Sequence, residues 1–120
     1  MIPRRVHGYL DYAVSFLVML SPWLFGFADD DTARRVALAV GGAGVLYSLM
    51  TDYELGVIRV IPFSMHLTLD FFSGLFLAAS PWLLGFADRV STPHLLFGLL
   101  EMGAALMTRR SSIDRRARTI

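Results

Sequence analysis

The sequence contains no cysteine and no lysine, and all eleven of its basic residues are arginine. The absence of cysteine excludes disulfide frameworks, thiol catalysis and cysteine-ligated metal sites. Charged residues are scarce, at 18% of the 120 residues, whereas soluble domains usually carry about 25%. Hydrophobic residues make up 55% of the chain. This composition is not that of a soluble domain, and the net charge of +1 favours no class of partner.

The usual enzyme signatures are absent as well. The sequence has no glycine-rich phosphate-binding loop, no His-Glu-x-x-His helix and no Ser-His-Asp arrangement built on a nucleophile turn. We therefore expect a protein that is not an enzyme and that carries no cofactor.

Four apolar segments occupy most of the chain, at about residues 7–28, 33–51, 63–87 and 90–108. A helix that spans a membrane needs about 20 largely apolar residues. The first and third segments meet that length comfortably, and the second and fourth are shorter. We predict an all-α fold: a polytopic membrane protein with four transmembrane helices in one membrane domain.

Two stretches of nine residues are almost identical. SPWLFGFAD begins at Ser21, and SPWLLGFAD begins 59 residues later at Ser80. The match continues upstream at the same offset, and 13 of the 28 positions in residues 2–29 are identical. Self-similarity of this kind is the signature of a repeat architecture. The chain is therefore a tandem duplication.

The duplication and the charges predict a topology. Repeat one is predicted at residues 2–52, repeat two at residues 61–110, and a basic cytoplasmic tail at residues 111–120. Each repeat is then a two-helix hairpin, and the two hairpins lie parallel. Four spans place eight arginines on the side of the termini and three on the other. The positive-inside bias therefore predicts a multi-pass protein of the cytoplasmic (inner) membrane with both termini in the cytoplasm.

Each letter of the repeated motif has a structural interpretation. A proline inside a helix removes a backbone donor and predicts a kink. The preceding serine can bond back to the preceding turn or cap a helical restart. The tryptophan suits a membrane interface, and the glycine would let a neighbour approach closely. A ligand contact at the kink is the alternative. The motif residues are Ser21, Pro22, Trp23 and Gly26 in repeat one, and Ser80, Pro81, Trp82 and Gly85 in repeat two.

The doubled motif, each copy in the first helix of a two-helix unit, resembles the SPW repeat family of small bacterial integral membrane proteins. The resemblance covers both repeats and hence nearly the whole chain. It implies a membrane location and a layout of four helices in two repeats. It implies no activity and no catalytic residue, so the function has to be inferred from the polar residues.

A second repeated pattern is His-x-x-x-Asp, with His7 and Asp11 in repeat one and His66 and Asp70 in repeat two. A spacing of four places both side chains on one helix face. If the two faces meet, two imidazoles and two carboxylates converge. Three interpretations stay open: hydrogen bonds that fix the register of the repeats, a site for a divalent metal such as zinc or manganese, or a protonatable pair on a transport path. A b-type haem on the two histidines is a fourth.

Glu101 interrupts the fourth apolar segment, and the alignment of the repeats offers only glycine opposite it. A charge at the centre of a span costs about 2.5–3.5 kcal/mol on insertion scales. Glu101 is therefore predicted to be neutral or hydrogen-bonded to a hydroxyl such as that of Tyr47, Ser48 or Ser15. Because it departs from the duplication, it is the best single candidate for a functional residue. A neutral acid in the bundle core and an oligomer contact are the alternatives.

Small residues recur in the second apolar segment. Ala33, Ala37 and Gly41 follow one another at a spacing of four, and Gly42 and Gly44 come next. Small residues at this spacing let helices pack closely in a membrane. Packing within the chain is the first interpretation, and a homodimer through this face is the second.

Two functions stay open on these grounds. The first is a membrane scaffold or interaction module of unknown biochemical activity. The second is a minor transporter or ion-binding protein that uses the His/Asp pairs and Glu101. A polar cavity from Asp11 and Asp70 to Glu101 would favour the second, and a dry, filled bundle the first. The lipid bilayer is the expected partner, and nucleic acid is not expected.

Overall fold

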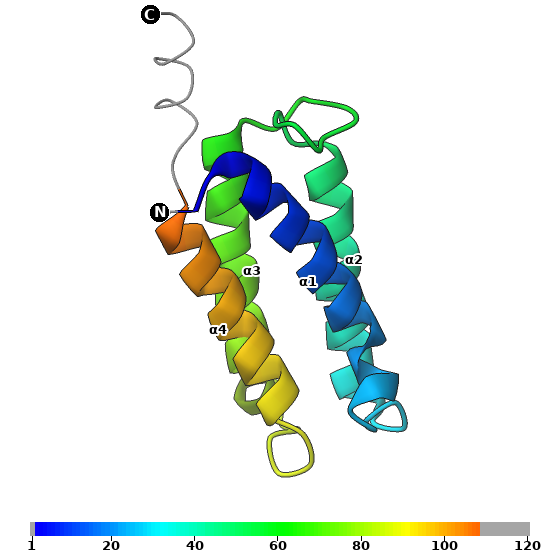
Figure 1. The fold of residues 1–120 in the computed structure, drawn as a ribbon. Helices are drawn as coiled ribbons and strands as arrows, with labels where there is room; N and C mark the ends of the chain where they lie inside the picture. The colour runs from blue at the N-terminus through cyan, green and yellow to red at the C-terminus, as the bar shows by residue number, and fades with distance from the viewer. Residues whose placement is uncertain (1, 109–120) are drawn as a thin grey trace, which may run out of the picture.

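The computed structural model describes residues 2–108, and its regular elements in that range are four α-helices (Figure 1). The all-α prediction is confirmed for these residues. The basic tail predicted at residues 111–120 lies outside them. The helices are α1 (Arg4–Leu24), α2 (Asp31–Leu49), α3 (Phe63–Leu83) and α4 (Thr92–Met107).

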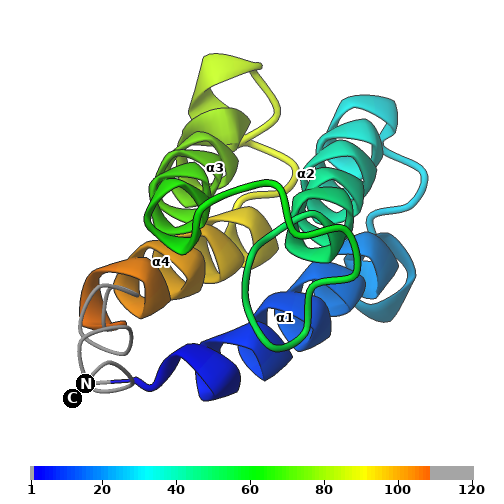
Figure 2. The same cartoon turned by 90° about the horizontal axis from the view of Figure 1, so that it is seen from above.

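Two helical hairpins stand side by side and point the same way (Figures 1 and 2). α1 packs mainly on α2, and α3 packs mainly on α4. The turns within the hairpins lie at one end of the bundle, which we call the hairpin end (Figure 1). The link between α2 and α3 lies at the other end, the link end. This is the parallel arrangement that the duplication predicts.

The Ser-Pro pair lies in the last turns of α1 and of α3. Pro22 has no N–H to donate to the carbonyl of Val18, four residues earlier. The hydroxyl of Ser21 donates to that carbonyl instead, at 2.6 Å. The hydroxyl of Ser80 makes the equivalent bond to the carbonyl of Leu77, at 2.7 Å. Of the two roles predicted for these serines, the bond back to the preceding turn is the one observed, because it satisfies the carbonyl that the proline leaves without a donor.

The role predicted for the two motif glycines is wrong. Among the described residues, nothing lies within 4 Å of the point where a side chain on Gly26 or Gly85 would begin. Their φ angles are +75° and +77°, a conformation that residues with a side chain rarely adopt. The amide of the next residue, Phe27 or Phe86, donates to the carbonyl of the motif proline at 2.8 Å. The glycines therefore end their helices in Schellman-type turns rather than admitting a close neighbour.

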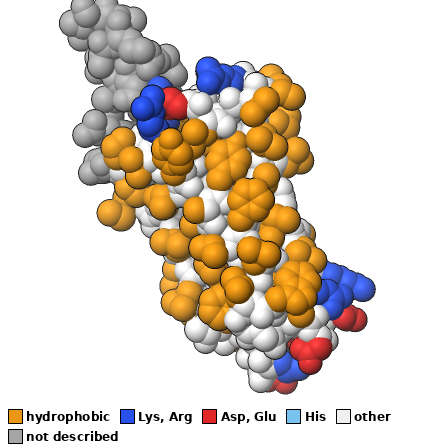
Figure 3. Space-filling model, turned by 45° about the vertical axis from the view of Figure 1, so that its right-hand side comes forward, with side chains coloured by type: hydrophobic (Ala, Val, Ile, Leu, Met, Phe, Trp, Pro, Cys, Tyr) orange, Lys and Arg blue, Asp and Glu red, His pale blue; other side chains and the backbone are white. Residues whose placement is uncertain are grey.

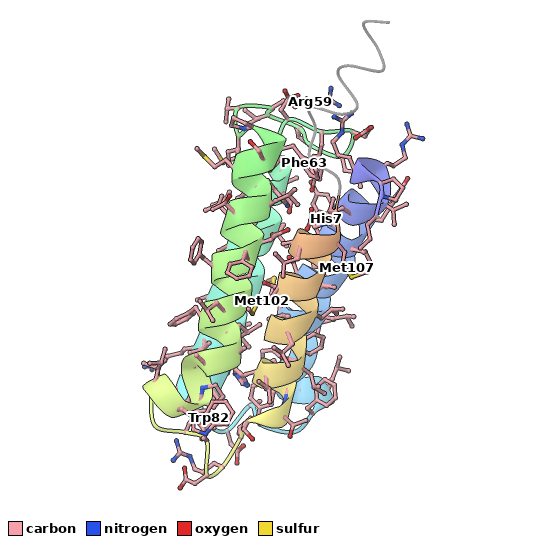
Figure 4. All side chains as sticks on the ribbon, turned by 90° about the vertical axis from the view of Figure 1, so that its left-hand side faces the viewer. His7, Arg59, Phe63, Trp82, Met102 and Met107 are labelled. Carbon is pink, nitrogen blue, oxygen red and sulfur yellow. The ribbon has the colours of Figure 1, made fainter. Side chains whose placement is uncertain are left out.

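The motif aromatics divide between core and surface. Phe27 and Phe86 are buried, and both contact the buried ring of His94, with ring centroids 5.0 and 4.9 Å apart. Trp23 and Trp82 are exposed, and Trp82 lies at the hairpin end (Figure 4). Phe27 therefore joins the first hairpin to His94 of the second, Phe86 packs on the same ring within its own hairpin, and the tryptophans face outward.

The small residues of α2 are used within the chain. Ala33, Ala37, Gly41 and Gly44 are all buried. A side chain on Gly41 would begin 2.8 Å from the backbone oxygen of Ser15 on α1, so this stripe allows the two helices to approach closely. A homodimer through the same face stays a prediction.

Apolar side chains cover much of the surface. On the face shown in Figure 3, hydrophobic side chains occupy the middle, and charged side chains gather toward the two ends. Within the described residues one helix, α3, is long and apolar enough to cross a membrane, and α4 is apolar but shorter. The prediction of four spanning helices is therefore supported by length and composition for α3 alone.

Candidate functional site

The two His-x-x-x-Asp pairs meet in the bundle interior near the link end. His7 and Asp11 come from α1, and His66 and Asp70 come from α3; all four side chains are buried. One nitrogen or oxygen atom from each residue lies within 4.8 Å of those of the other three. Figure 4 labels His7 at this level of the bundle. We call these four residues the His–Asp quartet.

Both imidazoles contact both carboxylates through Nε2. Nε2 of His7 lies 2.9 Å from Asp11 and 2.7 Å from Asp70. Nε2 of His66 lies 2.8 Å from Asp11 and 3.2 Å from Asp70. Each carboxylate thus contacts one histidine of its own helix and one of the other repeat. Although His66 Nε2 is this close to two oxygens, neither contact has hydrogen-bond geometry, and this buried atom has no hydrogen-bond partner among the described residues.

Two threonines orient the imidazole rings from behind. Nδ1 of His7 lies 2.7 Å from Oγ1 of Thr108, and Nδ1 of His66 lies 2.6 Å from Oγ1 of Thr51. Each threonine hydroxyl donates its own hydrogen to the carbonyl four residues earlier, at 2.5 and 2.6 Å respectively. The threonine oxygens are therefore the acceptors, and Nδ1 carries a hydrogen in both rings. Both Nε2 atoms consequently face the carboxylates.

Two tyrosines donate to the carboxylates. The hydroxyl of Tyr53, in the link, donates to Asp11 at 3.0 Å, and the hydroxyl of Tyr47, on α2, donates to Asp70. Burial, followed by the nearby charge of Asp11, raises the pKa of Tyr53 above its usual range. The Tyr53 hydroxyl therefore keeps its hydrogen and acts as a donor.

Glu101 lies beside the quartet rather than in it. A cavity of about 30 Å³ is bordered by Glu101 and Leu100 of α4, by three members of the quartet and by Tyr47. A cavity needs about 10–15 Å³ of such space to hold a water molecule. The cavity is therefore large enough for one or two waters and connects Glu101 with the quartet. We call it the Glu101 cavity.

The hydrogen bond predicted for Glu101 is wrong. Tyr47 directs its hydroxyl to Asp70, and the hydroxyl of Ser48 has no partner among the described residues. Oε2 of Glu101 is buried and likewise unpartnered within residues 2–108. Sequence reasoning could not foresee this, because the helix positions of these hydroxyls do not reveal which carboxylate they reach.

A family model described as the SPW repeat domain matches residues 5–108. The chain belongs to the SPW repeat family. The resemblance inferred from the doubled motif is thereby confirmed. No curated protein and no solved structure matches the chain.

Backbone hydrogen bonds join the end of each SPW repeat to the start of the other. The amide of Ile61, at the start of repeat two, donates to the carbonyl of Met50 at the end of repeat one, at 2.8 Å. The amide of Ile2, at the equivalent start of repeat one, donates to Met107 at the end of repeat two, also at 2.8 Å. These two hydrogen bonds bring each threonine next to the histidine of the other repeat.

The two threonines of the SPW repeats do not stand out in the sequence as partners of the histidines. Thr51 and Thr108 each follow the second helix of a repeat, but they are 57 residues apart rather than 59. The segment between the repeated motif and the threonine is two residues shorter in repeat two, which hides the equivalence. An alignment that allowed this gap would have paired them.

Proposed function

We propose that this SPW repeat protein is a four-span membrane protein that binds a cation at the His–Asp quartet. Glu101 lies on the route to the quartet. The observation that carries the proposal is the Glu101 cavity, which joins Asp11 and Asp70 to Glu101. A dry, filled bundle would have favoured a purely structural role.

The charges of the interior support a cation. Asp11, Asp70 and Glu101 bring three carboxyl groups to the cavity and the quartet, and the residues among 2–108 that line the cavity include no arginine. Carboxylates out of contact with water need a positive counter-charge. The two imidazoles supply it only when protonated, and a bound cation supplies it otherwise.

A membrane location is supported by the family and by the surface. The SPW repeat family was recognised above as one of membrane proteins, and large hydrophobic side chains are exposed on all four helices. α3 has 21 residues, which corresponds to a length of about 31 Å at 1.5 Å per residue, close to the thickness of a bilayer core. In the proposed topology the link end faces the cytoplasm and the hairpin end faces the opposite side.

Reporter fusions test this topology. A reporter fused after Ile120 and one inserted in the turn between α1 and α2 should report opposite sides of the membrane, with the C-terminal reporter in the cytoplasm. The same side for both would contradict four spans.

A membrane scaffold or interaction module is the second candidate. The observation that favours it is the quartet itself, which ties α1 to α3 and so fixes the two repeats against each other. In that case the quartet would be needed for stability and would respond to no cation. Neither candidate involves enzyme activity, because binding and structural support require no covalent step.

Thermal unfolding in detergent, measured with a panel of cations, separates the two candidates. Na⁺, K⁺, Mg²⁺, Ca²⁺, Mn²⁺ and Zn²⁺ would be compared at equal ionic strength. A cation at about 100 times its Kd stabilises the folded state by about 2.7 kcal/mol. We expect such a rise for at least one cation, its loss in Asp11→Asn and Asp70→Asn, and its retention in the control Asp88→Asn, whose side chain is 78% exposed. No response to any cation would overturn the proposal and leave the scaffold.

A further inference from the structure

We infer that the quartet is a four-coordinate site for a divalent transition metal of the zinc class. Its ligands are Nε2 of His7, Nε2 of His66 and one oxygen each of Asp11 and Asp70. The inference rests on the proposed function and names the kind of cation.

The ligand set favours this class of ion. Imidazole nitrogen suits zinc and its neighbours in the first transition row, whereas Mg²⁺ and Ca²⁺ take six or more oxygen ligands. Among residues 2–108, the quartet supplies two nitrogens and two carboxylates within 4.8 Å of one another. Two nitrogen and two oxygen ligands around one point match the tetrahedral preference of Zn²⁺.

The ligand atoms have to move toward equal separations before a tetrahedral ion fits between them. The four contacts between imidazole nitrogen and carboxylate oxygen measure 2.9, 2.7, 2.8 and 3.2 Å. Ligand atoms at about 2.0–2.1 Å in a tetrahedron lie about 3.3 Å apart. These nitrogen–oxygen pairs therefore have to open by a few tenths of an ångström, while the wider separations within the set, which reach up to 4.8 Å, have to close by rotation of the side chains.

The surroundings of the histidines are those of metal ligands. A histidine that binds a metal usually donates its other ring N–H to an oxygen, which fixes the tautomer and the orientation of the ring. Thr108 and Thr51 accept this hydrogen from His7 and His66. Nε2 of His66 is buried, points at the centre of the quartet and lacks a hydrogen-bond partner among the described residues. A metal ion at that centre would complete its coordination.

The carboxylate of Asp70 is arranged in a compatible way. Oδ1 of Asp70 accepts from Tyr47, while Oδ2 of the same residue faces both histidines. One oxygen is thus held by a hydrogen bond, and the other is available as a single ligand. Two carboxylates neutralise a divalent ion in full, so the loaded site carries no net charge into the low-dielectric interior.

Co²⁺ is the probe for this inference, because it replaces Zn²⁺ and reports its own geometry. Tetrahedral Co²⁺ absorbs visible light far more strongly than octahedral Co²⁺. We expect the purified full-length protein in detergent to bind Co²⁺ at about one ion per chain, with bands of tetrahedral intensity that Zn²⁺ abolishes. His7→Gln and His66→Gln should lose these bands. The matched control is His94→Gln, which alters a buried histidine at the hairpin end and should retain them.

A second variant covers the case in which the histidine variants do not fold. Thr51→Val leaves all four ligands in place and removes the acceptor for His66 Nδ1, together with the hydrogen bond from the same hydroxyl to the carbonyl of Tyr47. The affinity for Co²⁺ should fall by about 10–100-fold, as for other losses of a group that orients a ligand, and Thr51→Ser should restore it. An unchanged affinity in Thr51→Val would contradict the role of His66 as a ligand.

The outcomes separate this inference from the proposed function. If Mg²⁺, Ca²⁺ or Mn²⁺ stabilises the protein but Co²⁺ gives only weak octahedral bands, the zinc-class site is overturned and the cation site stands. If no cation binds at all, both are overturned. Tetrahedral Co²⁺ bands that survive in folded His7→Gln and His66→Gln would also overturn the ligand assignment.

Discussion

In repeat one Gly44 lies against the hydroxyl of Ser15, whereas at the same place in repeat two Glu101 lies against Gly74. In each hairpin one helix provides a polar side chain and the other provides the space for it. In repeat one the first helix carries the polar side chain and the second carries the glycine. In repeat two the first helix carries the glycine, and the second carries a carboxyl group in place of the hydroxyl. The exchange places beside the quartet, in repeat two alone, a carboxyl group whose buried oxygen has no hydrogen-bond partner among the described residues.

The repeats also differ in the side chains that surround the carboxylates. Tyr47 of repeat one and Ala104 of repeat two stand at equivalent positions, and both line the Glu101 cavity. The tyrosine donors to the quartet come from α2 and the link, and Glu101 comes from α4. The histidines, aspartates and threonines are thus shared by both repeats, and the groups around them are not. The duplication thus supplies the atoms of the quartet, and the divergence of the repeats places one further carboxyl group beside them.

The largest effect on stability is expected from variants of the His–Asp quartet, to which both repeats contribute equivalent residues. Asp11→Ala or Asp70→Ala leaves buried histidines with one carboxylate instead of two. Loss of one partner from a buried ionic group costs about 3–5 kcal/mol, whereas hydrogen bonds between membrane helices average about 0.6 kcal/mol. We expect a loss of unfolding free energy nearer the first value, and similar for both variants, in denaturant titrations in detergent. Asp88→Ala is the exposed control. Losses of only a few tenths of a kcal/mol would show that the quartet is an ordinary set of hydrogen bonds.

The second effect tests how far the helix contacts of the repeats are equivalent. A side chain on Gly98 would begin 2.5 Å from the backbone of both Ala78 and Gly74. One on Gly41 would begin 2.5 Å from the flexible side chain of Met19 and 2.8 Å from the backbone oxygen of Ser15. Gly98→Ala should therefore cost about 1–3 kcal/mol of stability, and more than Gly41→Ala. Gly103→Ala, where nothing described lies within 4 Å, should be neutral or stabilising. Equal effects of Gly98→Ala and Gly103→Ala in thermal unfolding would contradict this packing.

The third prediction converts repeat two into a copy of repeat one at the cavity. The double variant Gly74→Ser and Glu101→Gly moves the polar group back to the first helix of the hairpin. The quartet is untouched, so Co²⁺ should still bind with tetrahedral bands. Its association rate should fall by about tenfold or more, because the ion no longer meets a carboxyl oxygen on its way to the quartet. Stopped-flow absorbance measures the rate, and an unchanged rate would show that Glu101 is not on the route.

The smallest effect is expected at the hairpin end. Asp30 and Arg89 stand at equivalent positions of the two repeats but carry opposite charges, and they pair at 2.5 Å. The hydrogen bond from Arg89 lowers the pKa of Asp30, so the stabilisation is present above the unfolded-state pKa of Asp30 and is lost as the pH falls through its folded-state pKa. Arg89→Gln should remove this part of the dependence of stability on acid pH. It should change the stability at neutral pH little, since Arg89 is 53% exposed. An acid unfolding curve that is the same for both proteins at low salt would contradict the pairing.

Sequence alone determined the repeat, the four helices and the family, because hydrophobic runs and the doubled motif are local and need no partner to be read. It also placed His7 with Asp11, and His66 with Asp70, on one helix face each, since a spacing of four has this result in any α-helix. The bond of Ser21 back to its own helix was one of two local options.

Only the tertiary structure decided what these faces meet. Helix periodicity orients a side chain about its own axis, and the partner is set by how the helices pack against one another. For that reason the sequence could not assign Thr51 and Thr108 to the histidines. Each threonine reaches the histidine of the other repeat only because backbone hydrogen bonds join the end of one repeat to the start of the other. The same reason explains why Tyr47 was matched with Glu101 although it bonds Asp70. The positive φ of Gly26 belongs to a turn closed within the motif, by the hydrogen bond from the amide of Phe27 to the carbonyl of Pro22. The contact of Phe27 with His94, by contrast, depends on how the helices pack.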